Sequence, residues 1–453
     1  SVREATLDLL GQFILSRPAF VERYYGAIAQ RIVDVGISVR KRVIKILREL
    51  CLKEPSSARA VDACCKMVSR VGDEEEVHKL VLRTFQDIWF GVADAAEPSA
   101  DEVEARCGQL VSVVSKAGAS AQRSDWLQQL ITKLLTPPSD GKGAKEHTRA
   151  VSTCTRLVAQ LMEMLLQLDE NGEAAEKPET LCSTLHALSL FCEARPALLL
   201  PHIELLPAYL QHDRYAPAIR HVAKMLPQLL AIIDRPPRKL LEKLEQFLGA
   251  LVFRVSESMM QLCCAALCAT VSQSRNYQLL HETLARLCGM MDRCKDPKEA
   301  DKLKEQVVRS ILCSGLLCRY FDFEAPSVGP HEAVTKSGDV VHVDGDYSKH
   351  VFDTLLGFTR VAGDAAGAMP ITALYALRGL GHICVRRHDL LPNARPVSAR
   401  ALQPGAPPQM KQQVLANYGE LLAAERERQA RLGAPTSDAA RRIAAKESTA
   451  LAE

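Results

Sequence analysis

One short pattern occurs twice near the beginning of the chain, and this repetition restricts the folds that the chain can adopt. The triplet Ser-Val-Arg at residues 1–3 returns at residues 38–40, and Pro18 returns as Pro55. A shared interval of 37 residues between an entry turn, an apolar stripe and a closing proline is typical of one supersecondary unit used repeatedly. Units of this size predict a helical solenoid, which packs each unit on its neighbours and leaves one long curved face for binding.

The apolar spacing within the first unit predicts a pair of helices. Val21, Ile28 and Ile32 recur at helical spacing after Pro18, and Gly36 then interrupts the pattern. Ser38 is positioned to cap the second helix, which has apolar residues on one face. We therefore expect a helical hairpin. Its structural positions are Gly36, Ser38, Val39, Val43, Ile46 and Leu47.

Composition also favours an all-α fold. Apolar residues make up 47% of the 453 residues, but aromatic residues make up only 5%. Sheet-rich proteins favour aromatic and β-branched residues, so this balance is typical of packed helices. The formal net charge is only +3, which gives no general attraction to polyanions. Any nucleic-acid site must therefore be a local patch.

Cysteine usage and hydropathy indicate the cellular compartment of the protein. The chain has 15 cysteines, many of them on apolar faces and without the spacing of a disulfide framework. We expect reduced thiols that pack as small apolar groups in an intracellular protein. No leader opens the chain and no apolar run reaches the ~18 residues of a membrane span, which predicts a soluble protein. Because the chain opens without Met, we interpret it as a fragment of a longer protein.

Proline, glycine and charge patterns suggest how the chain is organised. We predict helical repeats interrupted by polar loops at residues 94–104 and 136–145, with a flexible insertion later in the chain. The expected segments are HEAT repeats at 1–93, HEAT-like helices at 94–180, HEAT repeats at 181–324, the insertion at 325–350, helices at 351–391, a Pro-rich linker at 392–408, a long charged helix at 409–432 and a poorly ordered tail at 433–453.

A basic face on the second predicted helix is the best candidate for a binding site. At about 100° per residue, Lys41, Lys45 and Arg48 lie on one side of the helix, opposite the apolar stripe. Arg40 and Arg42 flank this ridge. Clustered cations on a rigid helix can contact DNA phosphates without reading bases. The alternative is a solvated polar face in which Arg40 joins neighbouring repeats.

Signals for catalysis and for cofactors are weak. Cys182, His186 and Cys192, like His281, Cys288 and Cys294, do not complete a four-ligand metal set, and core packing explains their positions better. No glycine-rich phosphate loop and no nucleophile with a matching base is present in the sequence. We therefore predict no catalytic residue, no metal and no cofactor, and a protein that is not an enzyme.

Residues 36–48, GISVRKRVIKILR, closely resemble the hallmark segment of the cohesin loader family, known as Nipped-B-like or sister chromatid cohesion protein 2. Residues 94–181 show no firm resemblance, and residues 325–350 depart from the family in length and composition. Further segments similar to the family, in the same order, are residues 2–5, 24–25, 317–324, 379–381 and 413–417.

The resemblance implies a hook-shaped array of HEAT repeats that binds double-stranded DNA and the cohesin complex, including its SMC subunits and kleisin. It also implies a nuclear, chromatin-associated protein that loads cohesin and stimulates the SMC ATPase. The small partner subunit of the loader binds an N-terminal arm that we expect to be missing here, and no membrane is involved. Alternatives are other HEAT scaffolds: a condensin-type subunit, a nuclear transport receptor or a phosphatase scaffold.

Overall fold

A computed structural model describes most of the chain, and nearly all of the described part is helical. The described residues are 2–91, 98–118, 120–137, 144–211, 215–216, 218–293, 304–325, 333–334, 340–341, 346–360 and 371–432. They form two compact units, Ser1–Asp234 and Arg235–Glu453. The predicted all-α class is confirmed. Strands β1 (Ala333–Val334) and β2 (Val340–Val341), paired antiparallel, are the exception among these residues.

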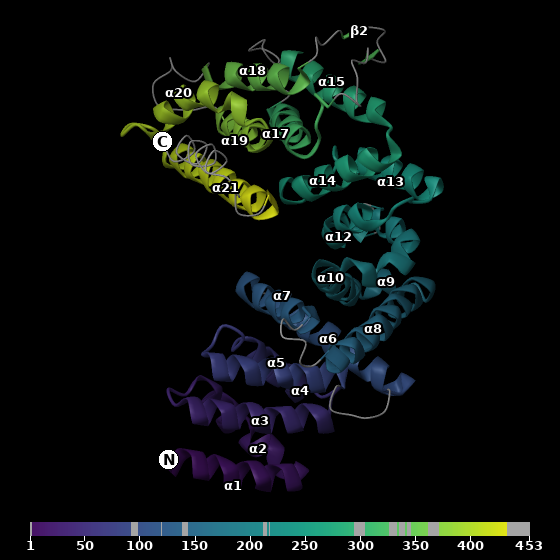
Figure 1. Ribbon diagram of the computed structural model, residues 1–453, viewed down its shortest axis with the longest axis vertical. Coiled ribbons are helices and arrows are strands. Elements are labelled where there is room, and N and C mark those ends of the chain that lie inside the picture. Colours follow the sequence, from purple (N-terminus) through teal and green to yellow (C-terminus); the bar gives the residue numbers. More distant parts are fainter. Residues whose placement is uncertain are drawn as a thin grey trace. The chain divides into compact units, whose positions relative to one another are not determined.

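The helices of the first unit stack in two rows (Figure 1). Helices α1, α3, α5 and α8 contact one another in succession, and α4, α6, α10 and α12 form a second succession. The elements are α1 (Val2–Ser16), α2 (Pro18–Ala29), η1 (Gln30–Val33), α3 (Ile37–Lys53), α4 (Ala58–Val68), α5 (Glu75–Phe90), α6 (Ala100–Gly118), α7 (Ala121–Leu135), α8 (Ala144–Glu170), α9 (Glu173–Glu176), α10 (Pro178–Ala194), η2 (Pro196–Leu198), η3 (Leu200–Leu210) and α12 (Ile219–Ile232).

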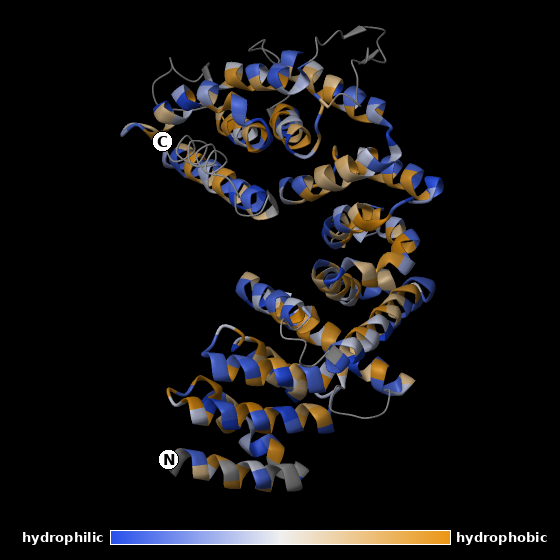
Figure 2. Cartoon of the chain, viewed as in Figure 1, coloured by the Kyte–Doolittle hydropathy of each residue, from blue (hydrophilic) through white to orange (hydrophobic). Residues whose placement is uncertain are grey.

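Helix α3 shows why each row is stable. Its apolar side chains recur every three or four residues, and Val43, Ile44 and Leu47 are completely buried. The core stripe includes Ile44 and Leu47, whereas Leu50 near the end of the helix is only half-buried. Figure 2 shows hydrophobic and hydrophilic residues alternating along the helices, as this packing requires.

The predicted cap at Ser38 is wrong. Helix α3 begins at Ile37, and its N-cap residue is Gly36, which offers no side-chain hydrogen bond. The carboxylate of Asp34 accepts a hydrogen bond from the Gly36 amide at 3.0 Å. The turn before the helix is therefore fixed by Asp34, and Ser38 lies within the first helical turn.

Helices of the second unit also pack in succession, α13 on α14, α14 on α17, α17 on α19 and α19 on α21. Helices α14 and α15 follow one another in the chain and contact each other as a hairpin. The elements are α13 (Arg238–Leu251), α14 (Glu257–Ser274), α15 (Tyr277–Arg293), α17 (Lys304–Tyr320), α18 (Tyr347–Arg360), α19 (Ile371–Arg386), η5 (His388–Leu390), α20 (Leu391–Leu402) and α21 (Pro408–Leu432).

Two predicted loop segments are partly helical. Residues 392–408 were expected to be a linker, yet most of them form α20, with Pro392 in the first turn, where a missing N–H costs little. Ala401 of this helix is buried against Met410 and Val414 of α21, which holds the segment in place. Similarly, residues 100–104 begin α6.

Other predicted boundaries fall partly or wholly outside the described residues. The tail at 433–453 lies outside them entirely, as do most of the insertion at 325–350 and most of the loop at 136–145.

Candidate nucleic-acid interface

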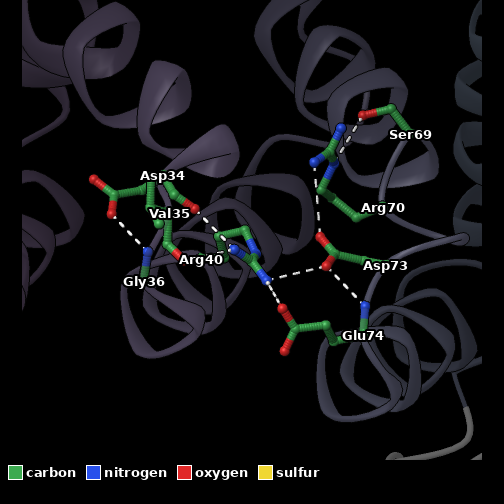
Figure 3. A network of polar contacts seen from close by, with 8 residues as sticks. All are labelled: Asp34, Val35, Gly36, Arg40, Ser69, Arg70, Asp73 and Glu74. Carbon is green, nitrogen blue, oxygen red and sulfur yellow. Dashed lines mark hydrogen bonds and ion pairs between the residues drawn. The ribbon is translucent and has the colours of Figure 1, made fainter.

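Arg40, a predicted DNA contact, lies in a buried network instead (Figure 3). Its guanidinium donates to the carbonyl oxygens of Asp34 at 2.9 Å and Val35 at 3.1 Å. It also donates to the carboxylates of Asp73 and Glu74, both at 3.1 Å. The Arg40 side chain is only 9% exposed. The alternative that Arg40 joins neighbouring repeats is therefore confirmed.

The two carboxylates of this network belong to the turn before α5. Asp73 also accepts a hydrogen bond from the Glu74 amide at 2.8 Å and pairs with Arg70 at 3.7 Å. Arg40 thus connects the turn that starts α3 to the turn that starts α5. A planar guanidinium suits this role, because it can satisfy several acceptors at fixed angles.

Two further cations of α3 pair with carboxylates of α5. Lys41 donates to Glu76 at 2.7 Å, and Arg48 donates to Asp87 at 2.9 Å. The hydrogen bond from Lys41 lowers the pKa of the Glu76 carboxyl below its ordinary value, so this pair remains ionised at neutral pH. The predicted basic ridge is therefore largely an ion-pair ladder between adjacent repeats.

Lys45 differs from its neighbours on α3. It is exposed, and within the described part of the chain its side chain makes no hydrogen bond or ion pair. Arg42 is half-buried and engaged in an interaction of its own. All five predicted cations thus lie on one helix. Among them, Lys45 is the most accessible to a bound phosphate, because it is exposed and has no partner in the described structure.

Sequence reasoning missed the carboxylates that complete this ladder. Asp73, Glu74, Glu76 and Asp87 stand 33, 34, 35 and 39 residues after the cations they contact. These separations cluster around one repeat interval. Opposite charges spaced by one repeat were therefore a usable signal for contacts between equivalent helices.

Cysteines and histidines considered as metal ligands occupy packed positions. Cys192 and His281 are buried, as the core-packing interpretation predicted, whereas Cys294 lies outside the described residues. His186 stacks on His221, with 4.7 Å between ring centroids. In the residues that the structure covers, no group of three or more His, Cys, Asp or Glu side chains is arranged to hold a metal ion. Nor does any helix there have the length and apolarity needed to cross a membrane.

Comparison with known proteins identifies the family. No family model matches the chain. Nipped-B-like protein B of Danio rerio is 33% identical over 379 residues, which cover 80% of this chain and 12% of that protein. The chain belongs to the Nipped-B-like family. Nipped-B-like protein of Homo sapiens is 32% identical over 369 residues, covering 77% of this chain and 13% of the human protein. The chain thus spans about an eighth of the length of these relatives.

A solved structure supports the fold of this Nipped-B-like chain. The Chaetomium thermophilum cohesin loader SCC2, C-terminal fragment, superimposes with a TM-score of 0.74 over 94% of this chain and 31% of that one. Sequence identity is 20%, so the likeness concerns the fold alone. The helical solenoid predicted from the repeat is therefore confirmed.

Proposed function

We propose that the chain is a DNA- and cohesin-binding portion of a cohesin loader. In this role it helps to load cohesin onto chromatin in the nucleus and stimulates the ATPase of the SMC subunits without catalysing a reaction itself. The observation that carries the proposal is 33% identity to a Nipped-B-like protein over 80% of the chain. The solenoid fold, shared with a protein named as a cohesin loader, supports it.

Within this proposal, DNA meets the α3 face through its exposed cations. Lys45 is available directly, whereas Lys41 and Arg48 would exchange Glu76 and Asp87 for phosphates. For Lys41 this exchange costs little, because an exposed ion pair such as Lys41–Glu76 contributes only about 0–1 kcal/mol. The exchange at Arg48 costs more, because the Asp87 side chain is only 12% exposed. Arg42 extends the face. Arg40 is left out, because its side chain is only 9% exposed and its terminal nitrogens donate to Asp34 and Asp73.

A pair of variants tests the DNA role of α3. Lys45→Glu should weaken binding to a labelled DNA duplex without changing the melting temperature, because Lys45 has no ion pair to lose in the described structure. The triple variant Lys41→Glu, Lys45→Glu, Arg48→Glu should weaken binding further, for every DNA sequence. Unchanged affinity in both variants would remove α3 from the DNA site, and lost helicity in the triple variant would favour a structural role.

Binding to cohesin is tested separately. The chain should co-purify with cohesin assembled from its SMC and kleisin subunits, and it should hydrolyse no ATP when assayed alone. Absence of any complex with cohesin would contradict this part of the proposal, and turnover by the isolated chain would contradict the scaffold assignment.

A further inference from the structure

Helix α21 of the second unit carries apolar residues on two opposite sides. Its inner side packs on α19 and α20 (Figure 1), and Met410, Val414 and Leu421 are buried there. On its outer side, Leu415 is 65% exposed and Leu422 is 41% exposed. A helix that packs against its neighbours on one side needs only one apolar side. The described part of the chain leaves the second apolar side of α21 uncovered.

The exposed apolar residues of this outer side form one continuous strip. At about 100° per residue, they lie within an arc of roughly 120°, opposite the buried residues of the inner side. Single exposed apolar residues are common, but a strip with helix-packing spacing indicates a site for another helix. This outer strip consists of Leu415, Ala416, Gly419, Leu422 and Ala423.

Gly419 allows a second helix to come close at the centre of the outer strip. Apart from the backbone of α21 itself, no atom of the described residues lies within 4 Å of the position that a Cβ atom would take at residue 419. Ala416 and Ala423, on one flank of the strip, are also small. The distance between two packed helix axes, usually about 8–10 Å, depends on the side chains at the contact. A helix that crosses α21 at Gly419 can therefore pack at the short end of this range.

The outer strip is symmetrical about Gly419. Leu415 and Leu422 lie four residues before and three residues after it, and Ala416 and Ala423 lie three before and four after. When two copies of α21 run antiparallel and cross at Gly419, Leu415 of one copy meets Leu422 of the other. On the opposite flank, Ala416 meets Ala423. The same residues thus form an apolar layer of leucines and a close layer of alanines, so the strip is complementary to itself.

Polar groups at the two ends of the outer strip favour the antiparallel arrangement over a parallel one. Arg426 and Gln412, both exposed, continue the strip by about one turn in either direction. In the antiparallel pair, Arg426 of one copy lies beside Gln412 of the other, whose side-chain oxygen can accept a hydrogen bond. In a parallel pair, the two Arg426 guanidinium groups would meet and repel each other.

The other charged side chains of α21 near the outer strip are engaged within the chain. The strip itself therefore carries no charge, and a contact through it depends on apolar burial. The engaged groups are Lys411, which donates to the carbonyl oxygen of Pro404 at 3.3 Å, Glu420, which pairs with Arg319 of α17, Glu425, which pairs with Arg428 at 2.9 Å, and Glu427, which has an interaction of its own.

We propose that the chain self-associates through the outer strip, with two copies of α21 packed antiparallel around Gly419. This proposal goes beyond the DNA and cohesin roles and does not depend on them. A two-fold contact uses the same surface on both copies, which is the commonest arrangement in protein dimers. The strip and its two polar ends supply about seven residues from each copy, fewer than the roughly 20–30 of a stable interface, so the dimer is weak and forms at micromolar or higher concentration.

Sedimentation equilibrium of the full chain from about 1 to about 200 μM tests the proposal. The double variant Leu415→Glu, Leu422→Glu should weaken dimerisation by roughly tenfold or more, because it buries unpaired charges in the contact. The control Leu9→Glu, Leu52→Glu changes two leucines of the first unit with nearly equal exposure, 71% and 42%, and should dimerise like wild type. Circular dichroism should be unchanged in both variants, and high salt should not dissociate the wild-type dimer.

Cross-linking tests the arrangement of the two copies. Gly419→Cys places two thiols at the crossing point, where mild oxidation with diamide should join the two copies through a disulfide. Ala430→Cys is the matched control, because residue 430 is exposed but its two copies stand about 33 Å apart in the antiparallel pair. A dimer band should form on a non-reducing gel for Gly419→Cys and not for Ala430→Cys. Equal cross-linking of both variants would contradict the antiparallel arrangement.

Three outcomes would overturn self-association through α21. A wild-type chain that stays monomeric at the highest concentration, with no cross-link through Gly419→Cys, would exclude the dimer. A dimer that persists in Leu415→Glu, Leu422→Glu would place the contact elsewhere on the chain. A monomer in which the thiol of Gly419→Cys resists alkylation by a maleimide would show that the same chain covers the outer strip, for which residues 433–453 are the nearest candidates. None of these outcomes would affect the proposed role in cohesin loading.

Discussion

At the scale of single residues, sequence reasoning located the cations of α3 correctly but could not decide their partners. Helical periodicity places Lys41, Lys45 and Arg48 on one side of a helix. Whether a neighbouring helix offers a carboxylate depends on how two repeats align, which periodicity within one helix does not define. Arg40 illustrates the result, because a residue predicted to contact DNA lies within a buried network.

Replacing Arg40 should destabilise the first unit. Arg40→Ala would leave the carboxylate of Asp73, which is 11% exposed, without its main partner. Loss of one member of a buried ion pair costs about 3–5 kcal/mol, so the free energy of unfolding in urea should fall by that order. Lys41→Ala is the matched control, and it should cost less than about 1 kcal/mol because its pair is exposed. Equal effects of the two variants would exclude a stabilising role for Arg40 in connecting the turns before α3 and α5.

The stacked histidines predict a dependence of stability on pH. Burial is the main cause that lowers the pKa of His186 to about 4 and that of His221 to about 3. In the unfolded chain both should titrate near about 6.5, so the unfolded state binds more protons below that pH. The free energy of unfolding should then fall as pH drops below about 6.5, by up to about 1.4 kcal/mol per pH unit for each histidine.

Urea unfolding at neutral and mildly acidic pH measures this effect. The double variant His186→Phe, His221→Phe keeps two stacked rings but cannot titrate, so its stability should depend less on pH. An identical pH dependence in wild type and variant would show that these histidines are not responsible.

At the scale of elements, close helix packing in the second unit depends on glycine. A Cβ atom added at Gly315 of α17 would lie 2.8 Å from the Cα atom and 3.0 Å from the carbonyl oxygen of Gly379 in α19. Both atoms belong to the backbone, so no side chain can move to make room. The resemblance of residues 379–381 to the family segment therefore has a physical reason in the contact between α17 and α19.

Gly315→Ala should force these helices apart. Overpacking of this kind typically costs about 1–3 kcal/mol, and the melting temperature of the second unit should decrease accordingly. Gly289→Ala in α15 is the control: nothing lies within 4 Å of its added Cβ, and alanine is the better helix former. A Gly315→Ala variant as stable as the Gly289→Ala variant would contradict the packing argument.

Element boundaries were the weaker part of the sequence prediction, for identifiable reasons. The start of α6 carried a readable signal, since Ser99 and Glu102 form a reciprocal capping box with hydrogen bonds of 3.1 and 3.2 Å. For α20 no local signal sufficed: its prolines predicted a linker, and burial of Ala401 against α21 overrides them. Tertiary packing decides such segments, and sequence patterns describe it poorly.

At the scale of the whole molecule, the repeat interval was enough to predict a helical solenoid, because each unit must bury its apolar face on the next. The family came from longer segments, and comparison with Nipped-B-like proteins confirmed it. The proposed role in cohesin loading, by contrast, rests on this kinship and on no single side chain.

The ATPase rate of purified cohesin, measured with duplex DNA in the presence and absence of this chain, tests the proposed function most directly. We expect the rate to rise with chain concentration and to saturate, and the rise to be smaller for variants that lose DNA binding. A rate that stays unchanged at saturating chain, together with no detectable binding to cohesin, would contradict the assignment of this chain to cohesin loading.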